Sequence, residues 1–556
     1  MKNKKTTFFC SIIILTIFLN FQLKSQSISP YLFGQNAWMP QYIDATYYNG
    51  QLDSHWQDIN DSHCKSVRIG GTAYDVHNPT GYYTQLCSLI NSIQLNGGEP
   101  IVQVSNDNGT YTASQAAAIV YAINTTYITS IKRKVKYWVI ANEPDGQYSG
   151  SLKQASGIAT YIKAFSIAMK GVTGQSDIKI IAPELSYYNS KGGNTYEILT
   201  DATNGLLNSS SSNDITGYYS TGGYYYVDYI SFHYYPFGPA AYNQTPASPT
   251  NVLTELSRTY GFNWQLGDLS TKVSAANTAH SRTGSNLLQT AITEGNINTV
   301  NPPDGYLNGV STNSFIAGQF WAEMMAYCMQ NSVQFMNFWS VIEGNDLGYL
   351  RNADASKRST YYHFQMVANN FKGTFSAGTL GGTGTLKAFG SYNSDQIAVL
   401  VMNQNTTSSL SYSIMFNTGT VGGTGSVKIN IPGPGLSSSI IYNGNINNQT
   451  STLLLFDPHG NLSQQINYGL SDSLSAPAIY TSCTAAGKIY ATQGQLDAYT
   501  PGVYSTITIG GTSSITLSAT NNSVYKAIGD IIINGEFIVP DGLGLSLELL
   551  PGSACQ

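Results

Sequence analysis

Eight short apolar runs, separated by segments whose apolar residues recur at helical spacing, constrain the fold of this chain most strongly. They lie between residues 30 and 345. Short strands that alternate with helices are typical of a parallel sheet covered by helices, and eight such units indicate an α/β fold of the (β/α)8 TIM barrel type. The predicted strands are Leu32–Gln35, Ser66–Ile69, Pro100–Val104, Tyr137–Ala141, Ile178–Ala182, Tyr229–His233, Ala291–Glu294 and Gln334–Trp339.

Three of the intervening segments carry the clearest helical patterns, with Ser, Thr or Asn start signals: Thr112–Asn124, Leu152–Val172 and Ser314–Gln330. A doubly wound open sheet is the alternative fold. Such a sheet normally has a Gly-rich phosphate-binding turn after an early strand, and Arg-Ile-Gly-Gly-Thr at 68–72 resembles that turn only faintly. The pattern therefore favours the barrel.

Alternating strands replace this pattern after a helix that begins at Ser359-Thr360 and runs to about Phe371. Period-2 alternation between Gly, Asn and Ser turns predicts an antiparallel β-sandwich. Its predicted strands include Gln396–Met402, Ser409–Phe416, Val427–Ile431 and Thr452–Phe456.

A third region of very short strands follows residue 474 and predicts a small β-stack or sandwich. The runs are Ser505–Ile509, Ser514–Ser518, Asp530–Ile533, Glu536–Val539 and Leu545–Leu549. Residues 525–533 resemble the short stacked-strand modules that close many secreted bacterial proteins. We therefore expect this small all-β domain to serve attachment, secretion or binding, including attachment to the cell surface.

The N-terminus has the layout of a secretory signal peptide. Lys2, Lys4 and Lys5 precede an apolar run from about Phe8 to Phe21, which is short and polar-interrupted for a membrane anchor. We expect cleavage near Ser25, a secreted protein and no membrane insertion of the mature chain. The predicted organisation is a signal peptide at 1–25, a barrel at 26–358, a sandwich at 359–473 and the small domain at 474–556.

The charge of the chain argues against nucleic acid as a partner. Loss of residues 1–25 removes four lysines and no acid, which changes the formal net charge from −5 to −9. Only 10% of the residues are charged, and the one basic run is Lys132-Arg133-Lys134. A surface rich in Gly, Asn, Ser, Thr and Tyr suits neutral polar ligands instead.

The cysteines and histidines show no metal-binding pattern. Five cysteines follow the signal peptide, none in a Cys-x-x-Cys motif, and the seven histidines are scattered, so no metal or other cofactor is expected. In an oxidising compartment Cys483 and Cys555 could bracket the last domain with a disulfide.

Two predicted strands end in a glutamate. Residues 138–145 run Trp-Val-Ile-Ala-Asn-Glu-Pro-Asp and place Glu143 at the end of the fourth strand, while residues 290–296 place Glu294 at the end of the seventh. Strand tips three places apart face one another across the mouth of a barrel, where barrel enzymes keep their chemistry. Two opposed carboxyl groups are what glycoside hydrolysis needs, one as proton donor and one to act on the anomeric carbon.

The Asn-Glu-Pro ending resembles the acid/base motif of the clan A glycoside hydrolases, and motifs at four further strand tips extend the resemblance. It implies that Glu143 is the acid/base and Glu294 the nucleophile of a retaining double displacement. It further implies substrate-binding or supporting roles for Arg68, for Asn142 at the sugar 2-hydroxyl, for one or more of His233, Tyr234 and Tyr235, and for Trp339 as the floor under the sugar.

Position alone suggests that Asn36, Trp38 and Asn106 line further subsites, because they follow the first and third strands. Glu184, Glu343 and Asp346 are competing carboxylates. A retaining mechanism also requires the pKa of Glu143 to be raised, by partial burial and by repulsion from Glu294, while Glu294 stays ionised through donors such as Arg68.

The leading hypothesis is a secreted retaining glycoside hydrolase that cleaves a β-linked polysaccharide or oligosaccharide. The alternative is a non-catalytic carbohydrate-binding or adhesive surface protein on a glycosidase-like barrel. A barrel that had lost its activity would be expected to lack one of the two glutamates, and both are present. No G-x-S-x-G elbow, P-loop or H-E-x-x-H helix points to another enzyme class.

Overall fold

The fold was determined as a computed structural model that describes most of the chain from Gln26 to Leu549. The predicted signal peptide, Trp38 and Cys555 lie outside the described residues. The gaps before residue 473 are 38–49, 77–82, 189–197, 239–249, 301–309, 344–345, 382–384, 418–420 and 432–439. The later gaps are 473–474, 482, 485–487, 491, 498–502, 505–506, 511–513, 518–523, 528–530, 534–536 and 541–545.

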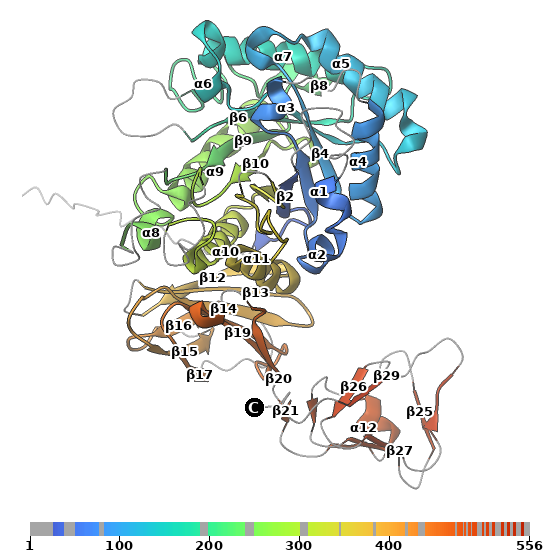
Figure 1. Cartoon of the computed structure of the whole chain (residues 1–556), viewed down its shortest axis with the longest axis vertical. Coiled ribbons are helices and arrows are strands. Elements are labelled where there is room, and N and C mark those ends of the chain that lie inside the picture. Colours follow the sequence, from blue (N-terminus) through green and yellow to red (C-terminus); the bar gives the residue numbers. More distant parts are fainter. Residues whose placement is uncertain are drawn as a thin grey trace, which may run out of the picture.

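Eight parallel strands close into a barrel, as predicted (Figure 1). Each predicted strand overlaps an observed one, because strands buried on both faces are short apolar runs. In barrel order the strands are β2 (Phe33–Ala37), β3 (Ser66–Ile69), β4 (Glu99–Val104), β5 (Tyr137–Ile140), β6 (Lys179–Leu185), β9 (Tyr229–Tyr234), β10 (Gln289–Gly295) and β11 (Phe335–Phe338). Glu143 therefore follows the fourth barrel strand, and Glu294 lies on the seventh.

Helices cover the outside of the barrel. The longer ones are α4 (Tyr83–Leu95), α5 (Ala113–Tyr121), α7 (Ala155–Lys170), α9 (Phe262–Ala279), α10 (Phe315–Gln330) and α11 (Ser359–Asn370). Short ones are α1 (Gly50–Asp53), α2 (Trp56–Asp61), α3 (Thr72–Val76), α6 (Pro144–Gln147) and α8 (Thr250–Glu255). The side chain of Thr112 caps α5 in a capping box with Gln115, and Ser314 caps α10.

Aromatic side chains close the barrel interior at its N-terminal end. Tyr137 and Phe335 pack edge to face with ring centroids 4.9 Å apart, and Tyr31 and Tyr229 pack around them. The C-terminal ends of the strands carry the polar side chains of the interior. The C-terminal end is also where the active sites of barrel enzymes lie.

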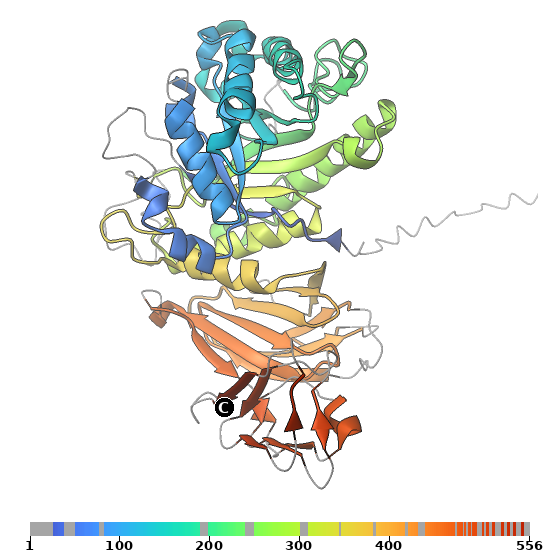
Figure 2. The same ribbon diagram turned by 90° about the vertical axis from the view of Figure 1, so that its right-hand side faces the viewer.

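A ten-stranded sheet packs beneath the barrel, and α10 and α11 lie between the two (Figures 1 and 2). Its path is β17 (Ile440–Ile446), β15 (Leu410–Phe416), β16 (Ser426–Ile429), β12 (Thr374–Leu380), β13 (Leu386–Tyr392), β14 (Ile397–Asn403), β18 (Thr450–Phe456), β19 (Leu462–Gly469) and β20 (Ala478–Thr481). The tenth strand, β1 (Gln26–Ser27), pairs with β12. Apolar residues of β13–β18 form a core within the sheet, as a sandwich requires.

The boundaries of these regions differ from the predicted ones in two places. The helix α11 packs on the barrel strands through Phe364 and bonds to the sheet through His363, so it contacts both regions rather than the sheet alone. The strand β20 pairs with β19, so the sheet continues past residue 473. Both differences arise because a helix or strand pattern does not state which neighbour it packs against.

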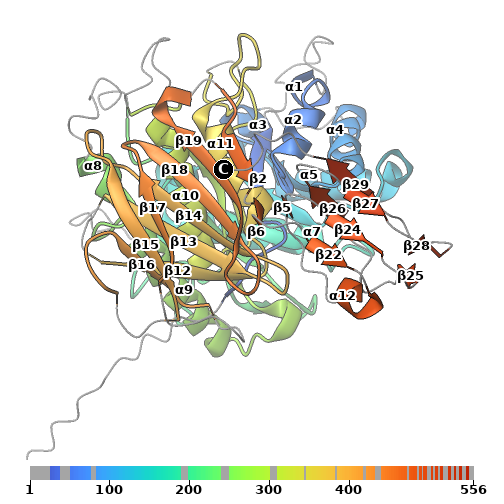
Figure 3. The same ribbon diagram turned by 90° about the horizontal axis from the view of Figure 1, so that it is seen from below.

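The last described strands form a small parallel stack beside the sheet (Figure 3). One row is β21 (Cys483–Thr484), β23 (Val503–Tyr504), β26 (Val524–Ala527) and β29 (Ser546–Leu549). The others are β22 (Lys488–Tyr490), β24 (Ile507–Ile509) and β27 (Ile531–Ile533), and β25 (Ile515–Thr516) with β28 (Phe537–Ile538). The stack has its own apolar core, which includes Leu496 and Tyr525.

Cys64, Cys87 and Cys328 are buried free thiols. The pairing of Cys483 with Cys555 stays a prediction. Among the described helices, none has the length and apolar character needed to cross a membrane.

Candidate active site

Glu143 is held at the barrel mouth by an unusual backbone. The strand β5 ends at Ile140, and Ala141 and Glu143 then adopt left-handed conformations, with φ of 67° and 44°. Such angles are costly for residues other than Gly and concentrate at functional sites. The N–H of Glu143 donates to the carbonyl oxygen of Glu184 at 2.9 Å, and Pro144 then starts α6.

Glu294 faces the same space from the opposite side of the mouth. Strand β10 changes register against both neighbours near this residue, and such a bulge lets both Thr293 and Glu294 face the interior. One carboxylate oxygen accepts the Tyr235 hydroxyl at 2.7 Å, and the other accepts Arg68 Nη1 at 3.1 Å. The carboxylate is thus fixed by a cation and a neutral donor.

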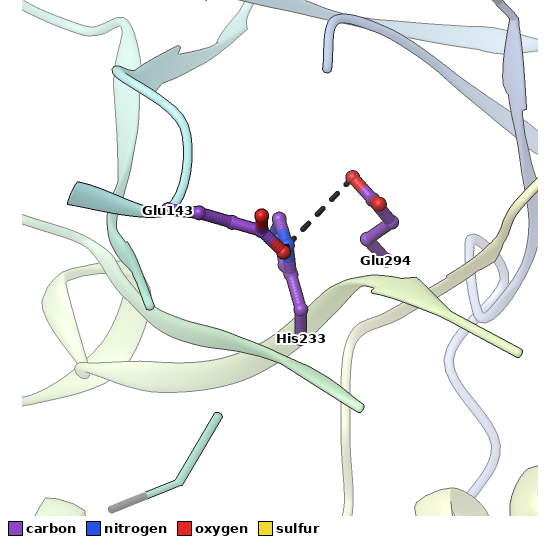
Figure 4. A group of neighbouring side chains, drawn as sticks. All are labelled: Glu143, His233 and Glu294. Atoms are coloured by element: carbon purple, nitrogen blue, oxygen red, sulfur yellow. Dashed lines mark hydrogen bonds and ion pairs between the residues drawn. The ribbon is translucent and has the colours of Figure 1, made fainter. Parts of the chain in front are cut away.

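His233 lies between the two glutamates (Figure 4). Its Nδ1 is 2.9 Å from Glu143 Oε1 and 3.7 Å from Glu294 Oε2, and its Nε2 is 3.3 Å from Glu184 Oε2. One atom from each of Glu143, His233 and Glu294 lies within 4.8 Å of the others. These residue types can also bind a metal ion.

Three surrounding carboxylates control the charge of His233. Burial alone would lower its pKa, but Glu294, Glu143 and Glu184 outweigh burial and raise it to about 10. The three carboxylates therefore favour the imidazolium form of the ring near neutral pH. In that form the ring places a positive charge between Glu143 and Glu294.

The pKa values of the two glutamates are shifted opposite to the expectation from sequence. Burial would raise the pKa of Glu143, but hydrogen bonds from His233 and Gln147 and the charge of Arg68 hold it below its ordinary value. Burial raises the pKa of Glu294, against the opposing charges of His233 and Arg68 and with added repulsion from Glu143. The reversal arises because the imidazolium lies closest to Glu143.

Arg68 is fully buried at the end of β3 and joins the polar network beneath the site. Its two terminal nitrogens donate to five side-chain oxygens, those of Asn36 (2.9 Å), Glu294 (3.1 Å), Gln103 (3.2 Å), Asn142 (2.7 Å) and Glu184 (3.0 Å). A guanidinium suits this role because its planar fork presents several donors at fixed angles.

Alternation along β9 and into the next residue, Tyr235, separates three predicted site residues. His233 and Tyr235 face the mouth, whereas Tyr234 points out of the barrel, where its hydroxyl donates to Glu255 at 3.0 Å and its ring packs on Phe262. Tyr234 therefore cannot bind substrate at this site. Successive side chains of a strand point to opposite faces, which accounts for the difference.

Asn36 and Asn142 are also buried, and both make hydrogen bonds with protein groups around Arg68. The amide nitrogen of Asn36 donates to the carbonyl oxygen of Thr293 at 3.0 Å, and its oxygen accepts from Arg68. Asn142 accepts from Arg68 and donates to the Thr72 hydroxyl at 3.3 Å. Both side chains help to fix Arg68, and their predicted contacts with sugar stay predictions.

Asn106 and Trp339 differ in their access to the mouth. Asn106 is buried, and its side chain accepts the N–H of Gly109, which stabilises its own loop. Trp339 is partly exposed, and its ring lies directly against Gly71, where a Cβ would come within 2.7 Å of the indole. The ring thus forms one wall of the site beside β3, in a place that suits an apolar sugar face.

The competing carboxylates occupy other positions. Glu343 accepts the N–H of Leu347 at 2.7 Å, and Asp346 pairs with Arg358 at 2.7 Å, so both stabilise the loop after β11. Glu184 lies beneath the site and is fully buried.

Two contributors were missed by sequence reasoning. Gln147 donates to both Glu143 (2.8 Å) and Thr72 (2.7 Å), and Gln103 contacts Arg68 and the N–H of Gly71. A signal existed for each. Gln147 lies one helical turn after Glu143, and Gln103 is a polar residue inside an otherwise apolar strand.

Several solved structures of glycoside hydrolases share this fold. A family 51 α-L-arabinofuranosidase from Bifidobacterium longum matches with a TM-score of 0.54 at 14% identity over 70% of this chain and 85% of its own. An α-L-arabinofuranosidase from Thermotoga maritima matches with a TM-score of 0.52 at 15% identity, over 78% and 98%. A bifunctional glucanase-xylanase from a metagenome library gives 0.51 at 14% identity, over 78% and 97%.

No protein-family model and no curated protein matches the sequence. The structural likeness shows that the chain has the barrel fold of the clan A glycoside hydrolases.

Proposed function

We propose that this protein is a secreted retaining glycoside hydrolase that cleaves β-linked polysaccharides or oligosaccharides. The observation that carries the proposal is the separation of Glu143 and Glu294, whose facing carboxylate oxygens lie within 4.8 Å across the barrel mouth. Retaining enzymes hold their carboxyls about 5–5.5 Å apart, whereas inverting enzymes need about 6.5–9.5 Å to admit a water. The fold shared with solved glycosidases supports the coarser part of the proposal, a glycoside hydrolase.

In the first step Glu294 attacks the anomeric carbon and the bond from that carbon to the leaving oxygen breaks. Because the pKa of Glu143 is held low, the proton for the leaving oxygen starts on Nδ1 of the His233 imidazolium, 2.9 Å away, and passes through Glu143. This relay takes the place of the raised Glu143 pKa that was expected from the sequence. In the second step Glu143 takes a proton from water, whose oxygen attacks the anomeric carbon and displaces Glu294. The proton then returns to His233, and the starting charges are restored.

Arg68 and Tyr235 stabilise Glu294 when it leaves as a carboxylate, because both donate to its oxygens. Trp339 supplies a flat apolar wall for the sugar. Secretion is proposed from the Lys-rich N-terminus and the apolar run to about Phe21.

The test uses Glu294→Gly with sodium azide on an activated aryl glycoside. We expect turnover to fall by more than about a thousand-fold, and azide to restore it with formation of a glycosyl azide, because a small anion can replace the missing carboxylate. Glu343→Gly is the matched control and should keep its turnover. Rescue of Glu343→Gly but not of Glu294→Gly would overturn the assignment.

The substrate class needs a panel of glucan, xylan, mannan and galactan with matching aryl glycosides. An aryl α-L-arabinofuranoside is included because two structural neighbours are arabinofuranosidases. NMR of the first-formed product should show retained anomeric configuration. Binding without turnover by the wild type, unchanged in Glu143→Gln, would favour the non-catalytic adhesive protein.

A further inference from the structure

Glu184 is a carboxylate that the two-step chemistry above does not use. It lies near the end of β6, is completely buried and adopts a left-handed backbone with φ of 57°. A buried charge is retained only when it is paired and hydrogen-bonded. Its partners should therefore explain its presence.

Every acceptor position of Glu184 is directed at the site. Its Oε2 accepts from Arg68 Nη2 at 3.0 Å and contacts His233 Nε2 at 3.3 Å. Its Oε1 accepts the hydroxyls of Ser231 at 2.5 Å and Thr293 at 2.7 Å, and its carbonyl oxygen accepts the N–H of Glu143. One residue thus joins strands β3, β9 and β10 to the loop that carries Glu143.

We propose that Glu184 is a positioning residue that aims Arg68 at the nucleophile and the His233 imidazolium at the acid/base. This inference rests on the proposed function of Glu143 and Glu294. Because Glu184 is fully buried, it acts only through these two cations and does not touch substrate.

The charges around His233 set the direction of the effect. The groups that face its ring are Glu143 from the loop after β5, Glu184 from β6 and Glu294 from β10, and Arg68 from β3 lies behind Glu184 and Glu294. Removal of the Glu184 charge weakens the hold on the imidazolium proton. It also removes a negative charge near Glu294 and leaves Arg68 more available to it. His233 and Glu294 should therefore both lose their protons at lower pH in the absence of the Glu184 charge.

The test is Glu184→Gln, which changes charge with little change of shape. A Gln oxygen can still accept from Arg68 and His233, while its amide can donate to the hydroxyls of Ser231 and Thr293. We expect kcat to fall roughly 100-fold with KM changed less than about threefold, and both limbs of the pH profile of kcat/KM to move down by about one unit.

Glu323→Gln is the matched control, because Glu323 is a buried carboxylate on α10 that pairs with Lys387 at 3.3 Å, outside the barrel mouth. It should reduce stability without moving the pH profile. A Glu184→Gln enzyme whose profile stays in place, or moves up, overturns the proposal. If Glu184→Gln does not fold, Glu184→Asp is the second test, because Asp keeps the charge but is too short to reach both cations. A wild-type kcat in Glu184→Asp would equally overturn the proposal.

The outcomes distinguish this inference from the proposed function. Azide should rescue Glu294→Gly but not Glu184→Gln, because Glu184 forms no bond with the sugar. Failure of the Glu294→Gly rescue removes the proposed function, whereas an unmoved profile in Glu184→Gln removes only the positioning role.

Discussion

Tyr235 donates its phenolic hydrogen to Oε1 of Glu294 at 2.7 Å, and this bond joins the sixth barrel strand to the seventh. The preceding Tyr234 donates instead to Glu255 at 3.0 Å, on the outside of the barrel. Two adjacent tyrosines thus make the same kind of bond on opposite faces of one strand. They offer a matched pair of variants.

Tyr235→Phe is expected to lower kcat/KM by about 10–100-fold, since a hydrogen bond to a charged group contributes about 1.5–3 kcal/mol. Loss of a donor to the ionised carboxylate raises the pKa of Glu294 further, so the acid limb of the pH profile should move to higher pH. Tyr234→Phe should leave turnover within about twofold of wild type. Equal losses in the two variants would contradict the placement of Tyr235.

The barrel was predictable because its strands are apolar runs bounded by turn residues, and the observed strands overlap the predicted ones. The opposed glutamates followed from strand counting. Period-2 alternation in β9 could also have excluded Tyr234, since Tyr229, Ser231 and His233 all face inward.

The charge arrangement of the site was not predictable from the sequence. A Glu occurs at a strand end at 143, 184 and 294, and the sequence does not show that Glu184 lies beneath the other two. The reversed pKa shifts of Glu143 and Glu294 depend on the position of His233 between them. The pairing of the C-terminal strands was equally hidden, because runs of two to four residues do not specify their neighbours.

Gly71→Ala should weaken substrate binding. Gly71 has φ of 107°, and an added Cβ would lie 2.7 Å from the ring of Trp339, so the indole must move. We expect KM to rise several-fold, measured by initial rates on a soluble substrate. Gly97→Ala is the control, because Gly97 also has positive φ (80°) but open space around its Cα. Both variants should lose about 1 kcal/mol of stability, but only Gly71→Ala should change KM.

A chain that ends at Thr481 should fold and keep its turnover of soluble substrates. The C-terminal stack has its own core, whereas β20 still completes the large sheet.

A chain that ends at Asn370 should aggregate. In that chain Gln319 and His363 lose their partners Thr450 and Ser451, and the apolar face under α10 is exposed. Size-exclusion chromatography and initial rates check both. Aggregation of the longer chain would contradict the separation of the stack.

Asp75 should make the barrel less stable as the pH rises. Burial raises its pKa to about 6, against hydrogen bonds from Tyr148 and the N–H of Asn106. A carboxyl with a raised pKa contributes stability that is fully present below the unfolded value of about 3.9 and is lost as the pH rises through about 6. A shift of about two units corresponds to roughly 3 kcal/mol.

The stability of Asp75→Asn relative to wild type should therefore rise between pH 4 and pH 7 by roughly 3 kcal/mol. The reason is that the Asn amide is neutral at every pH and has nearly the shape of the protonated acid. Urea unfolding of both proteins at several pH values measures the difference.

Asp228→Asn should show the opposite pH dependence. Although Asp228 is buried, Lys170 and Lys179 hold its pKa below the ordinary value. Its contribution to stability is therefore present above about pH 3.9 and is lost as the pH falls through the lower folded value. The Asp228→Asn variant should thus be most destabilised at neutral pH. A stability difference between wild type and Asp75→Asn that does not change with pH would contradict the Asp75 prediction. It would show that ionisation of Asp75 costs no stability, because its hydrogen-bond donors offset its burial.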